Sequence, residues 1–117
     1  MRMRRPRSNS KYGNIKVEYD GQMFDSLKER NRYAELQLLQ KAGEISELQR
    51  QVKFELQPAF YHEGQKIRPI IYVCDFVYKE NDKQVIEDVK SPATRNNAVY
   101  KLKKKMMLYR GYEIKEM

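Results

Sequence analysis

The sequence contains no tryptophan, one cysteine and one histidine among its 117 residues. A single cysteine excludes an intramolecular disulfide, and Cys74 lies in an apolar run that favours a buried, unreactive thiol. A structural zinc site needs about four nitrogen or sulfur ligands, so Cys74 and His62 cannot build one. A Cys–His protease pair is also disfavoured, because His62 stands near Gly64 in a segment expected to be a loop. Any metal site must therefore rely mainly on carboxylates.

Long apolar runs are also missing, and no apolar stretch follows the basic start of the chain as a secretory signal would require. These absences favour a cytoplasmic protein. Lys and Arg number 24 against 16 Asp and Glu, which gives a formal net charge of +8. Such a surplus favours a polyanionic partner such as nucleic acid, although a generally solvated basic surface would account for it equally well.

We expect residues 1–13 to be a flexible basic arm and residues 14–117 to form one domain with a small core. Residues 15–19 alternate between apolar and polar side chains before the turn signal Asp20-Gly21. This pattern predicts a β-hairpin whose second strand covers residues 22–24.

Capping residues and apolar spacing predict two helices. The first covers residues 27–42, because Ser26 is a suitable N-cap and Gly43 follows the last turn. The second covers residues 97–110 and stops at Gly111. The apolar stripes expected on them are Tyr33, Leu36, Leu38 and Leu39 on the first, and Val99, Leu102, Met106 and Tyr109 on the second.

Strands are predicted where β-branched and aromatic residues concentrate. They cover residues 48–56, 67–78 and 84–90, with a last short strand near Tyr112 and Ile114. Residues 81–83 form the turn of a hairpin, and residues 91–97 form a loop before the second helix. The order of the elements predicts an α/β fold with a mixed central β-sheet flanked by helices.

Asp75 places a carboxylate in an otherwise apolar strand, which is costly unless the charge is paired, hydrogen-bonded or bound to a metal. On the next strand, Asp88 and Lys90 share one face by the period of two. If Asp75 and Asp88 stand level, two carboxylates and an ammonium group converge, and such carboxylates suit Mg²⁺ or Mn²⁺. The register that decides this is open, and the alternative is a buried Asp75–Lys90 ion pair with Asp88 exposed.

The segment Tyr72–Tyr78, followed after a short turn by Glu87-Asp88-Val89-Lys90, resembles the bipartite motif of PD-(D/E)XK nucleases. In that motif an Asp on one strand precedes Asp or Glu, any residue, and Lys on the next strand. From Lys11 onward the chain also resembles a family of small phage-encoded, resolvase-like proteins of this superfamily. The further matching stretches are Lys11–Asn14, Phe24–Glu29 with Arg32-Tyr33, Gln51–Pro58 and Tyr100–Lys104. Cys74 stands where the motif usually has proline.

The resemblance implies a restriction-endonuclease-like core and a metal-dependent endodeoxyribonuclease that uses Mg²⁺ or Mn²⁺ in a bacterial or phage-infected cell. Glu29, Asp75 and Asp88 would hold the metal, and Lys90 would assist the attacking water and the transition state. Glu29 also fits a capping box with Ser26, so its carboxylate has two alternative roles. Asp25 is a weaker candidate for the cap. Glu87 is expected to point away from Lys90 and to be exposed or salt-bridged.

Lysines concentrate on the second predicted helix, at positions 101 and 103–105. The residues expected to bind nucleic acid are Thr94, Arg95, Lys101, Lys104 and Lys105, with Tyr100 expected to pack. Lysines act as point charges on phosphates, so recognition of DNA shape, such as a junction or branch, is expected over base sequence. The resemblance also implies a homodimer. The alternatives are a non-catalytic basic nucleic-acid-binding module and, less favoured, a basic subunit that docks on an acidic protein.

Overall fold

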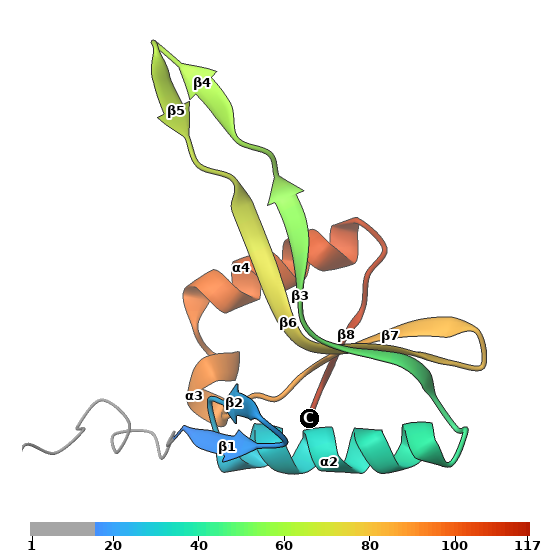
Figure 1. The fold of residues 1–117 in the computed structure, drawn as a ribbon. Coiled ribbons are helices and arrows are strands. Elements are labelled where there is room, and N and C mark those ends of the chain that lie inside the picture. The colour runs from blue at the N-terminus through green and yellow to red at the C-terminus, as the bar shows by residue number, and fades with distance from the viewer. Residues whose placement is uncertain (1–15) are drawn as a thin grey trace, which may run out of the picture.

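Residues 16–117 are described by the structure, a computed structural model, so the predictions for the N-terminal arm and for Ile15 lie outside the described residues. The elements are β1 (Val17–Tyr19), β2 (Gln22–Phe24), α2 (Leu27–Lys41), β3 (Ser46–Gln57), β4 (Phe60–His62), β5 (Gln65–Ile67), β6 (Ile70–Glu80), β7 (Lys83–Asp88), α3 (Pro92–Arg95), α4 (Ala98–Tyr109) and β8 (Ile114–Glu116). Figure 1 shows α2 along one side of a central sheet, and α3 and α4 on another.

The central sheet has the strand order β3-β6-β7-β8. The β3–β6 and β6–β7 pairs are antiparallel, whereas β7–β8 is parallel. The predicted mixed α/β architecture is therefore confirmed. The chain passes from β7 through α3 and α4 before it returns as β8. β8 pairs with β7 and forms one edge of the sheet.

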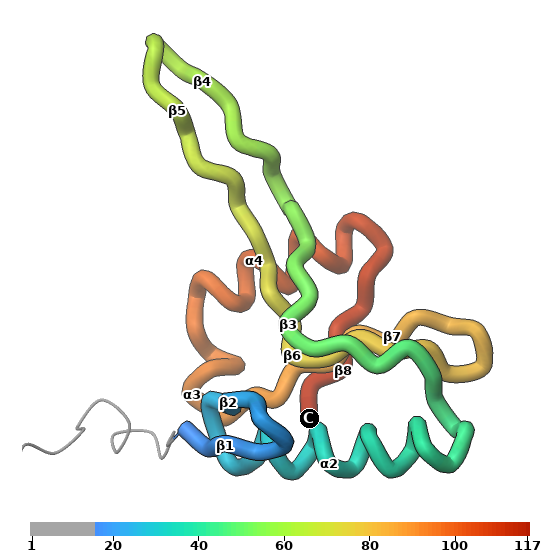
Figure 2. Tube along the Cα trace, in the orientation of Figure 1, coloured from blue at the N-terminus to red at the C-terminus, as the bar shows by residue number. Residues whose placement is uncertain are grey.

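Two apolar clusters cover different parts of β6. Tyr72 and Cys74 belong to a cluster with Tyr100 and Met107 of α4. Phe76 and Tyr78, on the same alternation of the strand, belong instead to a cluster with α2. The helix that covers this face of β6 therefore changes between Cys74 and Phe76. The tube trace shows that β3 and β6 bend together (Figure 2). As predicted, Cys74 is fully buried.

The predicted apolar stripe of the second helix is only partly covered, because Met106 packs against the core and the other three members are exposed. Val99, Leu102 and Tyr109 are 60%, 55% and 92% exposed, whereas Tyr100 and Met107 are buried. Spacing shows which residues share a face of a helix, but the contact with β6 and β8 decides which face is covered. Leu38 of α2 is likewise 68% exposed, while Tyr33 and Leu36 are buried as predicted.

Three local predictions need correction. Residues 60–67 form a two-stranded ribbon, β4–β5, that projects from the sheet in Figure 1, so His62 lies in a strand and not in a loop. The predicted loop at 91–97 contains the helix α3, because Ser91 caps it and Pro92 suits its first turn. Tyr112 lies outside β8. Among the described residues, no helix is long and apolar enough to span a membrane.

A buried ion pair fastens α2 to β7. The Arg32 guanidinium donates two hydrogen bonds to Glu87, at 2.8 Å from Nε to Oε1 and 2.7 Å from Nη2 to Oε2, and the Tyr78 hydroxyl donates a third. Glu87 is fully buried, which corrects the expectation that it could be exposed and bears out the salt bridge. Strand alternation sends Glu87 toward α2, on the opposite side from Asp88.

We predict that Glu87→Ala destabilises the fold by about 3–5 kcal/mol, because Arg32 would keep a charge that is largely buried and has lost its main partner. The matched control is Glu35→Ala, which removes a 65% exposed carboxylate from the same arginine, at 3.3 Å. That loss should cost less than about 1 kcal/mol. Urea unfolding of both variants measures the difference, and equal effects would contradict the importance of the buried pair.

Candidate active site

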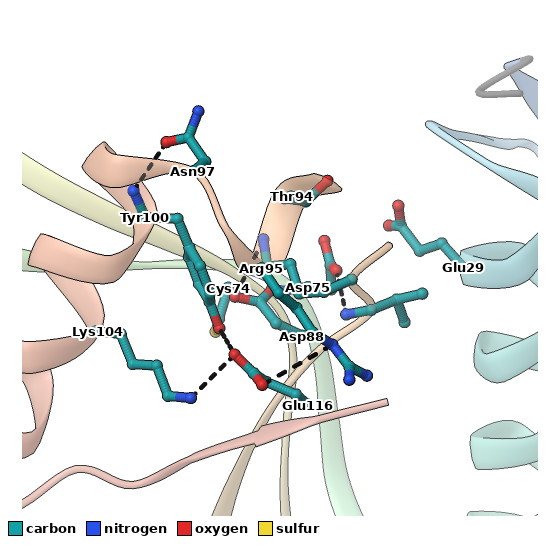
Figure 3. Close-up of polar contacts among 12 residues, drawn as sticks. Glu29, Cys74, Asp75, Asp88, Thr94, Arg95, Asn97, Tyr100, Lys104 and Glu116 are labelled. Carbon is teal, nitrogen blue, oxygen red and sulfur yellow. Dashed lines mark hydrogen bonds and ion pairs between the residues drawn. The ribbon is translucent and has the colours of Figure 1, made fainter. Parts of the chain in front are cut away.

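Asp75 and Asp88 lie side by side where the β6–β7 ladder ends. The last backbone pair of the ladder is Phe76 with Glu87. Just beyond it, the Asp75 N–H donates to Asp88 Oδ1 at 2.9 Å, and the Val89 N–H donates to Asp75 Oδ2 at 2.8 Å. Each carboxylate thus accepts a main-chain hydrogen bond from the opposite arm of the hairpin, and Figure 3 shows both side chains at this end of it.

Lys90 completes the group of side chains at this end of the hairpin. Its Nζ lies 3.6 Å from Asp88 Oδ2 and 4.4 Å from the centroid of the Tyr100 ring, and its side chain is 15% exposed. The alternative arrangement, in which Lys90 pairs with Asp75 and Asp88 is exposed, does not occur, since Asp88 is fully buried. Tyr100 packs as expected, and its ring restricts where the ammonium group can lie.

Glu29 approaches from the first turn of α2. Its N–H donates to the Ser26 hydroxyl at 3.1 Å, so Ser26 is the N-cap, and Asp25 is not. The Glu29 carboxylate accepts hydrogen bonds from Arg50 at 3.2 Å and Gln51 at 3.3 Å. It is 4% exposed and points toward Asp75 in Figure 3. Half of the capping box therefore forms, and the carboxylate faces the site.

Gln51 of β3 is a site residue that the sequence analysis missed. Its Nε2 lies 3.3 Å from Glu29 Oε2 and 3.3 Å from Asp75 Oδ1, so one amide bridges two carboxylates. Gln51 falls in a segment that matches the resemblance, but a glutamine in a strand carries no chemical signal by itself. Its contacts depend on a backbone angle that sequence spacing does not reveal.

A cleft of about 400 Å³ joins these elements. It is lined by Asp25, Ser26, Leu27, Lys28, Glu29, Asp75, Val89, Lys90, Ser91 and Thr94. Lys28 donates to the Lys90 carbonyl at 3.1 Å across one wall. A larger hollow of about 700 Å³ between α4, β7 and β8 is lined by a single carboxylate residue, Glu113, and does not gather the predicted site residues.

The carboxylates of the site are poorly compensated. Burial raises the pKa of Asp88 to about 6 despite the nearby Lys90. Burial, followed by repulsion from Asp75, raises the pKa of Glu29 to about 7. Burial also raises the pKa of Asp75. Asp88 Oδ2 is buried and has no hydrogen-bond partner within the described part of the chain, which is a costly state for a carboxylate oxygen.

These features fit a hard divalent cation, which would neutralise the carboxylates and satisfy oxygens that lack donors. Asp75 and Asp88 are the side chains best placed to hold it, with Glu29 across the cleft. Within residues 16–117, no group of three or more His, Cys, Asp or Glu side chains is close enough to form a complete ligand set. A cation here would therefore take further ligands from water, main-chain carbonyls or amides, as Mg²⁺ commonly does.

The residues predicted to bind nucleic acid fall into three groups. Arg95 and Lys104 contact Glu116, at 3.9 Å and 3.0 Å. The hydrogen bond from the Tyr100 hydroxyl, followed by these cations, lowers the pKa of Glu116. Lys101 and Lys105 are exposed on α4. Thr94 lines the cleft, where its hydroxyl lies 2.9 Å from that of Ser91.

Residues 9–117 match the family described as Protein of unknown function (DUF1064). The chain belongs to this family. No curated protein and no solved structure matches the chain. The description of the DUF1064 family names no activity.

We predict that, in EDTA, the free energy of unfolding falls as the pH rises from about 4 to about 7. The pKa values of Glu29 and Asp88 are raised in the folded state, so folding favours the protonated forms of these carboxyl groups. The stability gained from protonation is fully present below the pKa of the unfolded chain and is lost as the pH rises through the pKa of the folded state. Glu29→Gln should remove the contribution of Glu29 to this pH dependence. That contribution falls between its ordinary pKa of 4.5 and its raised pKa of about 7, and it is roughly 3 kcal/mol of unfolding free energy. Urea titrations across this range test it, with Glu18→Gln on β1 as the control.

Proposed function

We propose that the chain is a metal-dependent endodeoxyribonuclease of the PD-(D/E)XK type, which hydrolyses DNA phosphodiester bonds with Mg²⁺ or Mn²⁺. One observation carries the proposal: Glu29, Asp75 and Lys90 line the same cleft, and Asp88 stands level with Asp75 beside Lys90. A helical Glu, a strand Asp and an Asp-x-Lys that begins at the last residue of the neighbouring strand support the arrangement that the sequence motif implies.

In this proposal Asp75 and Asp88 hold the cation from adjacent strands, and Glu29 closes the site from α2. The cation would supply positive charge next to the scissile phosphate and lower the pKa of a bound water. Lys90 would orient that water and offset the charge that develops on the phosphate. Its contacts with Asp88 and the Tyr100 ring limit the positions of the ammonium, which favours such a role.

The proposed substrate is DNA recognised by its shape, with branched or junction DNA as the favoured form. Lys28 and Lys90 lie at the cleft, and the exposed Lys101 and Lys105 extend positive charge along α4. These lysines would contact phosphates, which carry no base sequence. Lys101 and Lys105 form no ion pair with any of residues 16–117, so they are better candidates than Arg95 and Lys104, which already contact Glu116.

A non-catalytic nucleic-acid-binding module is the second candidate. It is favoured by the absence of a complete acidic ligand set among the described residues and by the main-chain donors that already engage Asp75 and Asp88. In that case the acidic group would be structural, and binding to DNA would depend on salt and not on Mn²⁺.

We predict that Asp88→Asn and Lys90→Ala each reduce Mn²⁺-dependent DNA cleavage at least about 100-fold, because each removes charge next to the reacting phosphate. The assay uses labelled duplex, single-stranded and four-way-junction DNA with Mn²⁺, Mg²⁺ or EDTA. Lys83→Ala, at the exposed start of β7, is the matched control and should cleave like the unmodified protein. Undiminished cleavage by both site variants would refute the nuclease, whereas metal-independent binding without cleavage would favour the binding module.

We predict that Lys101→Ala/Lys105→Ala weakens DNA binding and lowers the slope of log K against log salt by about two, because two phosphate contacts are lost. Fluorescence anisotropy in EDTA at several salt concentrations measures both quantities. Lys41→Ala/Lys83→Ala removes the same charge from exposed positions on other elements. An equal slope change in both double variants would mean that net charge, and not α4, determines binding.

A further inference from the structure

Arg50 and Gln51 are consecutive residues of β3, yet both side chains reach the same oxygen of Glu29. Arg50 Nη2 lies 3.2 Å and Gln51 Nε2 lies 3.3 Å from Glu29 Oε2. In a regular strand, neighbouring side chains point to opposite faces, so two successive residues cannot share one partner. The local backbone of β3 must therefore depart from regular strand geometry.

The departure is at Gln51, whose φ is +52°. The β3–β6 ladder pairs Arg50 with Phe76 and Val52 with Cys74, but it has no pair between them, where Gln51 faces Asp75. A left-handed backbone at a residue other than glycine costs about 1–3 kcal/mol and persists where the surroundings require it. Gln51 is exposed, so burial of its side chain does not account for this cost.

The Gln51 amide occupies the space between two carboxylates that come from different elements. Its Nε2 bridges Glu29 of α2 and Asp75 of β6, at 3.3 Å from each. An amide offers a donor at one end and an acceptor oxygen at the other, and rotation of the amide exchanges them. Arg50, in contrast, carries donors alone and cannot bind a cation.

We propose that Gln51 is a further ligand of the cation site, supplying Oε1 beside Asp75 and Glu29. Without metal, the Nε2 group keeps the two carboxylates in place and reduces their repulsion. If a divalent cation bound at this site, the amide could turn to present its oxygen, the ligand type that Mg²⁺ and Mn²⁺ prefer. The inference rests on the proposed metal-dependent function. Gln51 would add a neutral amide oxygen to the carboxylate oxygens, which do not form a complete ligand set among residues 16–117.

The test compares Gln51→Asn, Gln51→Glu and the control Gln49→Ala by Mn²⁺ calorimetry and by urea unfolding in EDTA. Asn tolerates the left-handed backbone and keeps the amide, but its side chain is one methylene shorter. It should weaken Mn²⁺ binding about 10-fold or more. Gln51→Glu should bind Mn²⁺ at least as tightly as the unmodified protein, yet unfold more easily in EDTA because it adds a third carboxylate. Gln49→Ala, also exposed on β3, should change neither quantity.

The opposite effects of Gln51→Glu on the two measurements separate a ligand from a structural bridge, since a mere bridge would lose both stability and affinity. Unchanged Mn²⁺ affinity in Gln51→Asn, with the unmodified protein binding Mn²⁺ and cleaving DNA, would overturn the role of Gln51 and leave the nuclease intact. Absence of both Mn²⁺ binding and cleavage in the unmodified protein would overturn the proposed function, and this inference with it.

Discussion

The register of β6 against β7 decides which acidic side chains of this fold become neighbours. A slip of one residue would exchange the faces of Glu87 and Asp88, because side chains alternate with a period of two. The Arg32–Glu87 pair resists such a slip from the α2 side, and the main-chain hydrogen bonds of Asp75 and Asp88 resist it at the end of the ladder. Two adjacent acids thus have different surroundings: Glu87 fastens a helix to the sheet, and Asp88 lies buried next to Asp75 and Lys90, which line the cleft.

The buried carboxylates differ in how well their charges are paired. This difference distinguishes the acid that stabilises the fold from the acids of the proposed site. Glu87 accepts two hydrogen bonds from Arg32 and one from Tyr78, so its charge is well paired. Glu29 and Asp88 are also buried but keep raised pKa values, and Asp88 has an oxygen without a donor. Poorly compensated acids reduce stability, and fold stability alone would favour their replacement. Glu29 lines the cleft and Asp88 lies next to Asp75, which also lines it, so their raised pKa values support the proposed cation site.

Sequence patterns predicted the features that depend on residues close together in the chain, such as helix ends and turns. Ser26 and Gly43 bounded the first helix, and the turn at 81–83 correctly joined the strands that carry Asp75 and the Asp-x-Lys. Other features depend on contacts between distant segments and could not be predicted: the β6–β7 register, and the choice of Tyr100 and Met107 as the buried face of α4. The left-handed Gln51 was hidden for the same reason, because glutamine does not favour that conformation.

The C-terminal residues support the Asp-x-Lys segment through hydrogen bonds, although they are far from it in the sequence and outside the motif. The Met117 N–H donates to the Asp88 carbonyl at 2.9 Å, and the Lys90 N–H donates to the Met117 carbonyl at 3.3 Å. Glu116 accepts from the Tyr100 hydroxyl at 2.6 Å, and the Tyr100 ring lies against Lys90. β8 therefore holds both the main chain and, through Tyr100, the ammonium group of the site. The role proposed for Lys90 would need such support, because a long flexible side chain loses its effect when its position is not restricted.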